Sequence, residues 1–75
     1  MMTQRATKLG SLTEVLSIIK QYNYLDPRSL AERIFERIPN IRSDTIDNIK
    51  RAVIIAFKFN PIRISEILTE INALF

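Results

Sequence analysis

The 75-residue sequence contains no cysteine, no histidine and no tryptophan, and only one glycine. Without cysteine there is no disulfide framework and no thiol chemistry, and without histidine the usual zinc sites and imidazole bases are excluded as well. The sequence also lacks a glycine-rich phosphate loop and a carboxylate pair in an apolar setting that would tune it for acid–base work. We therefore expect a protein that is not an enzyme and that uses no cofactor and no metal.

Long apolar runs are missing too. The longest is AVIIAF, residues 52–57, far short of the roughly 18 residues that a membrane span needs. The N-terminus lacks the apolar core and cleavage site of a secretory signal. We expect a cytoplasmic protein with no membrane partner and no small-molecule substrate. Few glycines and abundant charge suit a heat-stable protein, but Arg outnumbers Lys 7 to 4, against the usual Lys and Glu enrichment, so composition does not decide thermostability.

The residues that are present describe a small basic domain. Hydrophobic residues make up 47%, and the net charge is +3, which permits nucleic-acid binding without requiring it. A single domain of this size has a marginal core and is usually stabilised by disulfides, metal, very good packing or association. Because the first two are excluded, we expect a homodimer or a subunit of a larger protein complex.

Apolar residues recur at three- and four-residue spacing in four segments, which predicts helices over about residues 11–23, 26–38, 43–58 and 61–74. The fold class is therefore all-α, a compact four-helix domain. Ser11 and Glu14 form a capping box, and Asp26-Pro27 and Asn60-Pro61 are typical helix starts. Ser43 or Asp44 is expected to cap the third helix. The predicted buried stripes consist of Leu12, Val15, Leu16, Ile19 and Tyr22; Leu30, Ala31, Ile34, Phe35 and Ile38; Ile46, Ile49 and Val53; and Ile64, Ile67, Leu68, Ile71 and either Leu74 or Phe75.

Residues 1–10 carry Arg5 and Lys8 and no acidic residue. A frayed tail, a basic arm that contacts phosphates or a groove, and a short strand over residues 4–9 are all compatible with this stretch. We interpret it as a flexible basic N-terminal arm.

The third helix changes character along its length. Its first half has a polar arc, whereas AVIIAF is apolar all round, so this part must be enclosed. Ile54 and Ile55 are candidates for an interface between chains, and the core of the same chain is the equal alternative. The apolar C-terminus also needs a neighbour. The full set of interface candidates is Ile54, Ile55, Phe59, Leu74 and Phe75.

Two stretches of the sequence, DPRSLAERIFE (residues 26–36) and NPIRISEILTE (residues 60–70), are similar when Asp26 is aligned with Asn60. The offset between them matches the period of several helix-pair repeats. The signature residues of the tetratricopeptide repeat are missing, and two units are too few for a stable solenoid. We favour convergence on the same helix start over a true repeat, and both alternatives make the similarity structural.

Residues 29–53, SLAERIFERIPNIRSDTIDNIKRAV, resemble the helix-turn-helix superfamily. The first helix of that family often reads Leu-Ala-Glu-Arg-Ile, as residues 30–34 do here, and its second opens with Ser or Thr and continues as residues 43–52 do. The longer connector is similar to winged-helix regulators of the ferric-uptake type, although a helix stands where the wing would be.

The resemblance implies that the third helix enters the major groove of double-stranded DNA with its N-terminal residues nearest the bases. Asp44 and Asp47, on the same arc, would repel phosphates. The DNA-binding residues that the resemblance and the basic arm indicate are Arg5, Lys8, Arg42, Ser43, Thr45, Asn48, Lys50 and Arg51.

Two functions remain in view. The first is a nucleic-acid-binding module, a dimeric helix-turn-helix-type DNA-binding protein in transcription or replication. The second is a non-catalytic accessory subunit, a helical bundle that docks on a larger complex such as a polymerase or another nucleic-acid enzyme. The angle between the second and third helices bears on this choice, because a helix-turn-helix joins its helices steeply and a bundle aligns them.

Overall fold

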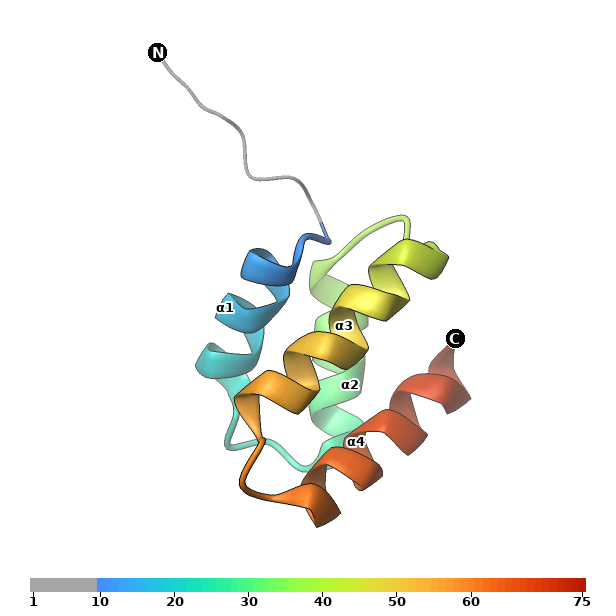
Figure 1. The fold of residues 1–75 in the computed structure, drawn as a ribbon. Helices are drawn as coiled ribbons and strands as arrows, with labels where there is room; N and C mark the ends of the chain where they lie inside the picture. Colours follow the sequence, from blue (N-terminus) through green and yellow to red (C-terminus); the bar gives the residue numbers. More distant parts are fainter. Residues whose placement is uncertain (1–9) are drawn as a thin grey trace.

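The computed structural model describes residues 10–75, and within them the chain forms four α-helices joined by short connections (Figure 1). The helices are α1 (Leu12–Tyr22), α2 (Pro27–Arg37), α3 (Ser43–Ala56) and α4 (Pro61–Leu74). No strand occurs in this part of the chain. The predicted all-α class is confirmed, and each helix begins and ends within two residues of its expected bounds.

Three of the four helices begin at the residues that the sequence indicated. The hydroxyl of Ser11 accepts from the amide of Glu14, and Asp26 and Asn60 accept from the amides three residues further on, each followed by a proline in the first turn. Such caps satisfy amides that the helix leaves unpaired, and each typically contributes about 1 kcal/mol. The chain therefore fixes these helix starts by local chemistry.

The start of α3 differs from the prediction that Ser43 or Asp44 caps it. Arg42 occupies the capping position and its side chain makes no capping hydrogen bond, while Ser43 is already helical. The carboxylate of Asp44 accepts from the amide of Thr45, 2.9 Å away, within the first turn. The preceding connection, residues 38–42, turns at Asn40, whose φ of 57° lies in the left-handed region that Asn tolerates better than most residues.

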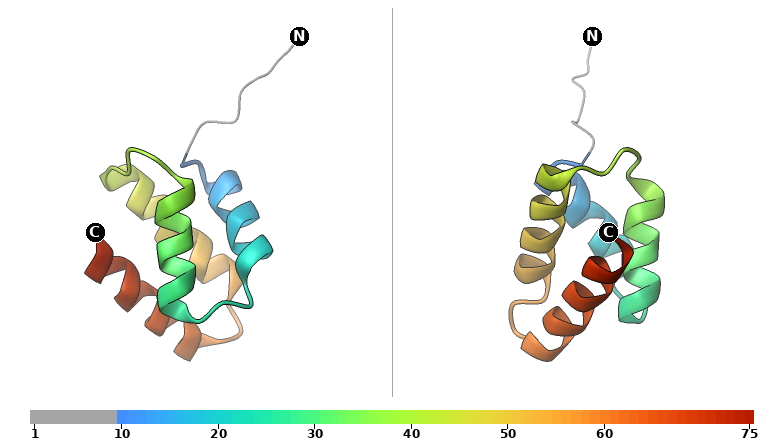
Figure 2. Two further views of the ribbon diagram at one scale, coloured as in Figure 1. Left: turned by 180° about the vertical axis from the view of Figure 1, so that it is seen from behind. Right: turned by 90° about the vertical axis from the view of Figure 1, so that its right-hand side faces the viewer.

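The helices form a bundle with the spatial order α1, α2, α4, α3. Helix α1 packs against α2 and α3, and α4 packs against α2 and α3. In Figure 1, α1 and α3 run downward while α2 and α4 run upward, and Figure 2 shows α2 and α3 on opposite sides. The two helix pairs, α1–α2 and α3–α4, therefore lie beside each other with corresponding helices in contact.

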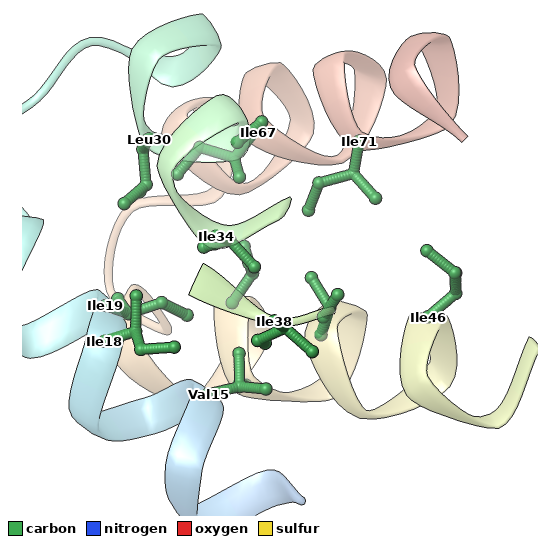
Figure 3. Packing of buried hydrophobic residues seen from close by; sticks show 13 residues of the cluster. Val15, Ile18, Ile19, Leu30, Ile34, Ile38, Ile46, Ile67 and Ile71 are labelled. Atoms are coloured by element: carbon green, nitrogen blue, oxygen red, sulfur yellow. The ribbon is translucent and has the colours of Figure 1, made fainter. Parts of the chain in front are cut away.

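The core lies at the centre of this arrangement, where aliphatic side chains from all four helices meet (Figure 3). Isoleucine dominates it, together with two valines, two alanines and one leucine. The fully buried larger side chains are Val15, Ile19, Leu30, Ile34, Ile38, Ile49, Val53, Ile67 and Ile71. All nine belong to the predicted stripes, whereas Ile18 and Ala52 are buried outside them. Packing of branched aliphatic side chains therefore supplies the stability that disulfides or metals supply in other small domains.

The helix-turn-helix-like span has its own geometry. Its two helices, α2 and α3, are joined by residues 38–42, yet their backbones do not approach each other closely. They occupy diagonal corners of the bundle and meet only through core side chains. In a helix-turn-helix the two helices are joined by a shorter turn and pack directly at a steep angle, so this span follows the bundle arrangement.

Candidate functional site

Two of the residues expected to contact DNA point into the molecule. Thr45 is only 8% exposed, and the amide group of Asn48 donates to the carbonyl oxygen of Gly10 at 3.0 Å. Arg42, Ser43 and Arg51 are exposed, and Lys50 is half-buried. Arg5 and Lys8 lie outside the described residues. The structure thus leaves Arg42, Ser43 and Arg51 on the surface of α3 but withdraws the side chain best suited to read adenine.

Gly10 explains why Thr45 and Asn48 face inward. Its φ is +82°, and a Cβ on it would lie 2.9 Å from Cγ2 of Thr45. Its amide donates to Oε1 of Glu14 at 2.7 Å, so Glu14 reaches back one residue beyond the Ser11 amide that a capping box uses and holds the chain just before α1. We call these contacts among Gly10, Glu14, Thr45 and Asn48 the Gly10 anchor. The anchor fastens the entrance of α1 to the first turns of α3.

The charge on the remaining outer face of α3 is mixed. Asp44 and Asp47 are both exposed there, and the guanidinium of Arg42 lies 3.9 Å from the carboxylate of Asp44. Residues 10–75 hold nine basic and eight acidic residues, a net charge of +1, because Arg5 and Lys8 carry the other two positive charges. A nearly neutral surface gives little electrostatic attraction for phosphates.

A second surface is both apolar and exposed. The exposed fractions are 49% for Ile54, 47% for Ile55, 90% for Phe59 and 73% for Ile62. These residues lie in the last turn of α3, the α3–α4 connection and the first turn of α4, so they are neighbours at one corner of the bundle. We call them the α3–α4 corner. At about 200 Å² for a fully exposed large side chain, they present about 500 Å², near the upper end for the largest apolar patch of a monomer.

The α3–α4 corner contains three of the five predicted interface residues, Ile54, Ile55 and Phe59. For Ile54 and Ile55, the alternative of burial in the core of the same chain is wrong, because both are about half exposed, whereas Ala52 and Val53 are buried and Phe57 packs against the core. The other two candidates, Leu74 and Phe75, are half-buried and exposed respectively, and lie at the far end of α4. The prediction missed Ile62, although its position opposite the stripe of Ile64, Ile67 and Ile71 could have revealed it.

Contacts made by Arg63 and Lys58 hold the α3–α4 corner in place. The Nη2 of Arg63 donates to the carbonyl oxygens of Asn23, at 2.8 Å, and Leu25, and its guanidinium lies 5.0 Å from the ring centre of Phe57. The ammonium of Lys58 lies 5.0 Å from the ring centre of Phe59. These contacts tie the α3–α4 connection to the α1–α2 connection, so the exposed apolar residues stand on a fixed support.

The charges around the corner have one sign. Between Asp47 and Glu66 the sequence holds four basic residues and no acidic one. None of the four, Lys50, Arg51, Lys58 and Arg63, forms an ion pair within residues 10–75, and Arg63 donates instead to backbone carbonyl oxygens. The apolar surface is thus flanked by cations whose acidic partners are not found in the described part of the chain.

The cleft between α2 and α4 is the remaining concave feature. Arg28 lies in it between Glu32, at 3.1 Å, and Glu70, at 3.7 Å, and the cleft is shallow and open.

Hydrogen bonds from the hydroxyl and amide of Ser29 lower the pKa of Asp26 below its ordinary value of 3.8. A carboxylate with a lowered pKa at a helix start serves the helix rather than proton transfer. No group of three or more potential metal ligands occurs within residues 10–75.

None of the helices in residues 10–75 combines the length and apolar character that crossing a membrane requires. Comparisons with protein-family models, curated proteins and solved structures found no match to this chain. The chemistry of the surface is therefore the basis for any functional conclusion.

Proposed function

We propose that this chain is a non-catalytic protein-interaction module that docks on protein partners through the α3–α4 corner. The observation that carries the proposal is the exposure of four large apolar side chains on a rigidly held corner, led by Phe59 at 90%. Exposed aromatic and aliphatic side chains grouped in one place are typical of protein–protein contact surfaces.

The comparison within the chain supports this proposal. When Asp26 is aligned with Asn60, the residues Ile54, Ile55 and Ile62 correspond to Lys20, Gln21 and Arg28 of the first helix pair, which are exposed and polar. The same structural positions therefore carry the polar residues expected of a solvated surface in one pair and isoleucine in the other. Isoleucine at three such positions costs solubility unless a partner covers it.

Nucleic-acid binding stays a prediction that none of these observations tests. The inward Asn48, the exposed acids of α3 and the net charge of +1 over residues 10–75 give it less support than the corner gives to protein binding. Because the two functions use different residues, one set of variants separates them.

The proposal is tested by giving the second helix pair the surface of the first. The triple substitution Ile54→Lys, Ile55→Gln and Ile62→Arg copies residues that the fold already tolerates at equivalent positions, so the circular dichroism spectrum should not change. Tagged wild type should capture protein partners, untagged copies of itself included, from an extract of its source cells, and the triple variant should lose them. The matched control, Thr13→Lys with Ser17→Lys, adds the same two charges to exposed positions of α1 and should retain them.

A titration with duplex DNA at two salt concentrations completes the test. For a protein-interaction module we expect no DNA binding whose affinity falls steeply as the salt concentration rises. If the triple variant captures the same proteins as wild type, or if DNA binds with a steep salt dependence and is released by Arg42→Ala and Arg51→Ala, the proposal is wrong.

A further inference from the structure

We infer that one partner of the α3–α4 corner is a second copy of this chain, bound through two α3 helices that run antiparallel about a twofold axis. This inference rests on the proposed function and names the occupant of the same surface. It is carried by the order of acidic and basic residues along the outer face of α3.

The outer face of α3 is acidic at its start and basic beyond its middle. Asp44 and Asp47 lie in its first turns, Ile54 and Ile55 in its last turn, and Lys58 directly after it, all exposed. Within residues 10–75, neither Asp47 nor Lys58 forms an ion pair. A surface with opposite charges at its two ends is complementary to itself when two copies meet head to tail.

Helix geometry fixes how such copies would align. Lys58 lies eleven residues beyond Asp47; the nine residues up to Ala56 belong to α3 and span about 14 Å along it, and Phe57 and Lys58 continue just past the end of the helix. When each Lys58 faces the Asp47 of the other copy, the twofold axis passes midway, between Ala52 and Val53. Ile54 and Ile55 then lie within about 4 Å of the axis along the helix, close enough to contact their own copies.

The same alignment that pairs the charges therefore buries the isoleucines. Phe59 follows Lys58 and extends the apolar contact over the first turns of the other α3, beside Asp47. Arg51 lies near the axis, so the two Arg51 side chains approach each other and must extend toward solvent. This arrangement uses the exposed residues of α3 and leaves the core unchanged.

A twofold contact fits this surface better than a contact with the first helix pair. The residues of that pair equivalent to Ile54 and Ile55 are Lys20 and Gln21, which would place a cation against the cations of the corner. The apolar part of this contact is small. At about 200 Å² for a fully exposed large side chain, Ile54, Ile55 and Phe59 offer about 370 Å² per copy, and contacts below about 1,200 Å² in total are typical of weak, transient association. We therefore expect a dimer that dissociates in the micromolar range.

The mass in solution is the first measurement. Sedimentation of the full chain over a concentration series should show exchange between 8.7 kDa and twice that mass. Ile55→Asp should weaken the dimer at least ~100-fold, because each dimer would bury two unpaired carboxylates. If wild type sediments as a monomer at every concentration up to the millimolar range, the inference is wrong.

A charge exchange tests the alignment itself. Lys58→Asp or Asp47→Lys alone should weaken the dimer about tenfold, because each substitution places like charges opposite each other twice. The combined variant should return to within about threefold of wild type. A combined variant that keeps its helical circular dichroism spectrum but dimerises no better than the single variants overturns the alignment.

Dimerisation and DNA binding predict opposite effects of Arg51→Ala on affinity. Removing the like charges near the axis should tighten the dimer several-fold, whereas a DNA-contacting Arg51 would make the same substitution weaken DNA binding. Weaker dimerisation by Arg51→Ala contradicts the inference. If wild type is monomeric but captures another protein that the triple corner variant releases, the second copy is excluded and the interaction function remains. If wild type is monomeric and captures no other protein, both the dimer and the interaction function are excluded.

Discussion

The two helix pairs of this domain turn from their first to their second helix at equivalent positions but present different faces. Helices α1 and α3 end at Tyr22 and Ala56, and α2 and α4 begin at Pro27 and Pro61, so both boundaries repeat at the same offset. Yet Arg33 and Arg37 of α2 are exposed, whereas Ile67 and Ile71, at the equivalent positions of α4, are fully buried. The pairs share these two inner boundaries and differ in which side of the second helix faces the core.

This difference shows that separate parts of the sequence determine where a helix begins and which side of it faces the core. Caps and prolines determine where a helix begins, and the chain uses the same solution twice. The apolar stripe determines how the helix is rotated, and the stripes of α2 and α4 are out of phase by about one residue. Ile62 faces outward next to the exposed end of α3, as Arg28 does at the equivalent position of α2. The interaction surface therefore follows from isoleucine at positions that stay exposed in both pairs, and the change of phase affects the core side of α4.

The largest predicted effect tests that change of phase. Ile71→Ala should lower the free energy of unfolding by about 2–5 kcal/mol, because it leaves a cavity in the core. Arg37→Ala at the equivalent position should cost about 1 kcal/mol or less, because Arg37 contributes an exposed hydrogen bond of 2.9 Å to the hydroxyl of Tyr22 and a cation–π contact with its ring. Urea unfolding measures both, and equal costs would contradict the rotated arrangement.

The Gly10 anchor has no equivalent contact in the second pair, and Gly10→Ala should reveal its importance. The substitution places a Cβ 2.9 Å from the Thr45 side chain at a φ of +82°, so we expect a loss of about 1–3 kcal/mol. Thr45→Ser removes the methyl group that the Cβ would meet. The loss caused by Gly10→Ala should therefore be smaller in a Thr45→Ser background, and an undiminished loss would show that the backbone conformation alone is responsible.

The smallest effect distinguishes the two capping residues by pH. Because the pKa of Asp26 is lowered in the folded state, its contribution to stability is present above pH 3.8 and is lost as the pH falls through the lowered value. Asn60 caps α4 in the same way but does not titrate. Thermal unfolding between neutral pH and pH 2 should therefore depend less on pH in Asp26→Asn than in wild type. Asn60→Asp should depend on pH more, and a variant that leaves the pH dependence unchanged would contradict this assignment.

Local signals account for the part of the structure that the sequence predicted. The capping residues Ser11, Asp26 and Asn60 act on amides three residues away, and the stripes repeat within single helices. Ile54 and Ile55 were identified because an apolar run longer than one helix face cannot all be buried by three other short helices.

Contacts between distant residues account for what it missed. Nothing near Thr45 or Asn48 in the sequence indicates that Gly10 will lie against them, because two whole helices separate it from them along the chain. Their polar side chains at a helix start looked like contacts for DNA. The diagonal placement of α2 and α3 is likewise set by how α1 and α4 pack between them, which helix periodicity does not specify.

The hydrogen bonds of Arg63 have a consequence for how the domain opens. Its guanidinium, in the first turn of α4 and so in the middle of the second helix pair, donates hydrogen bonds to the carbonyl oxygens of Asn23 and Leu25 in the middle of the first. In a stack of repeats, a terminal unit can fray while its neighbour stays folded, because each unit contacts the next only across one interface. Here the departure of α4 removes the partner of two carbonyls within the other pair and uncovers the core side of α2. The two pairs therefore lose their structure together, and the domain opens as one cooperative unit.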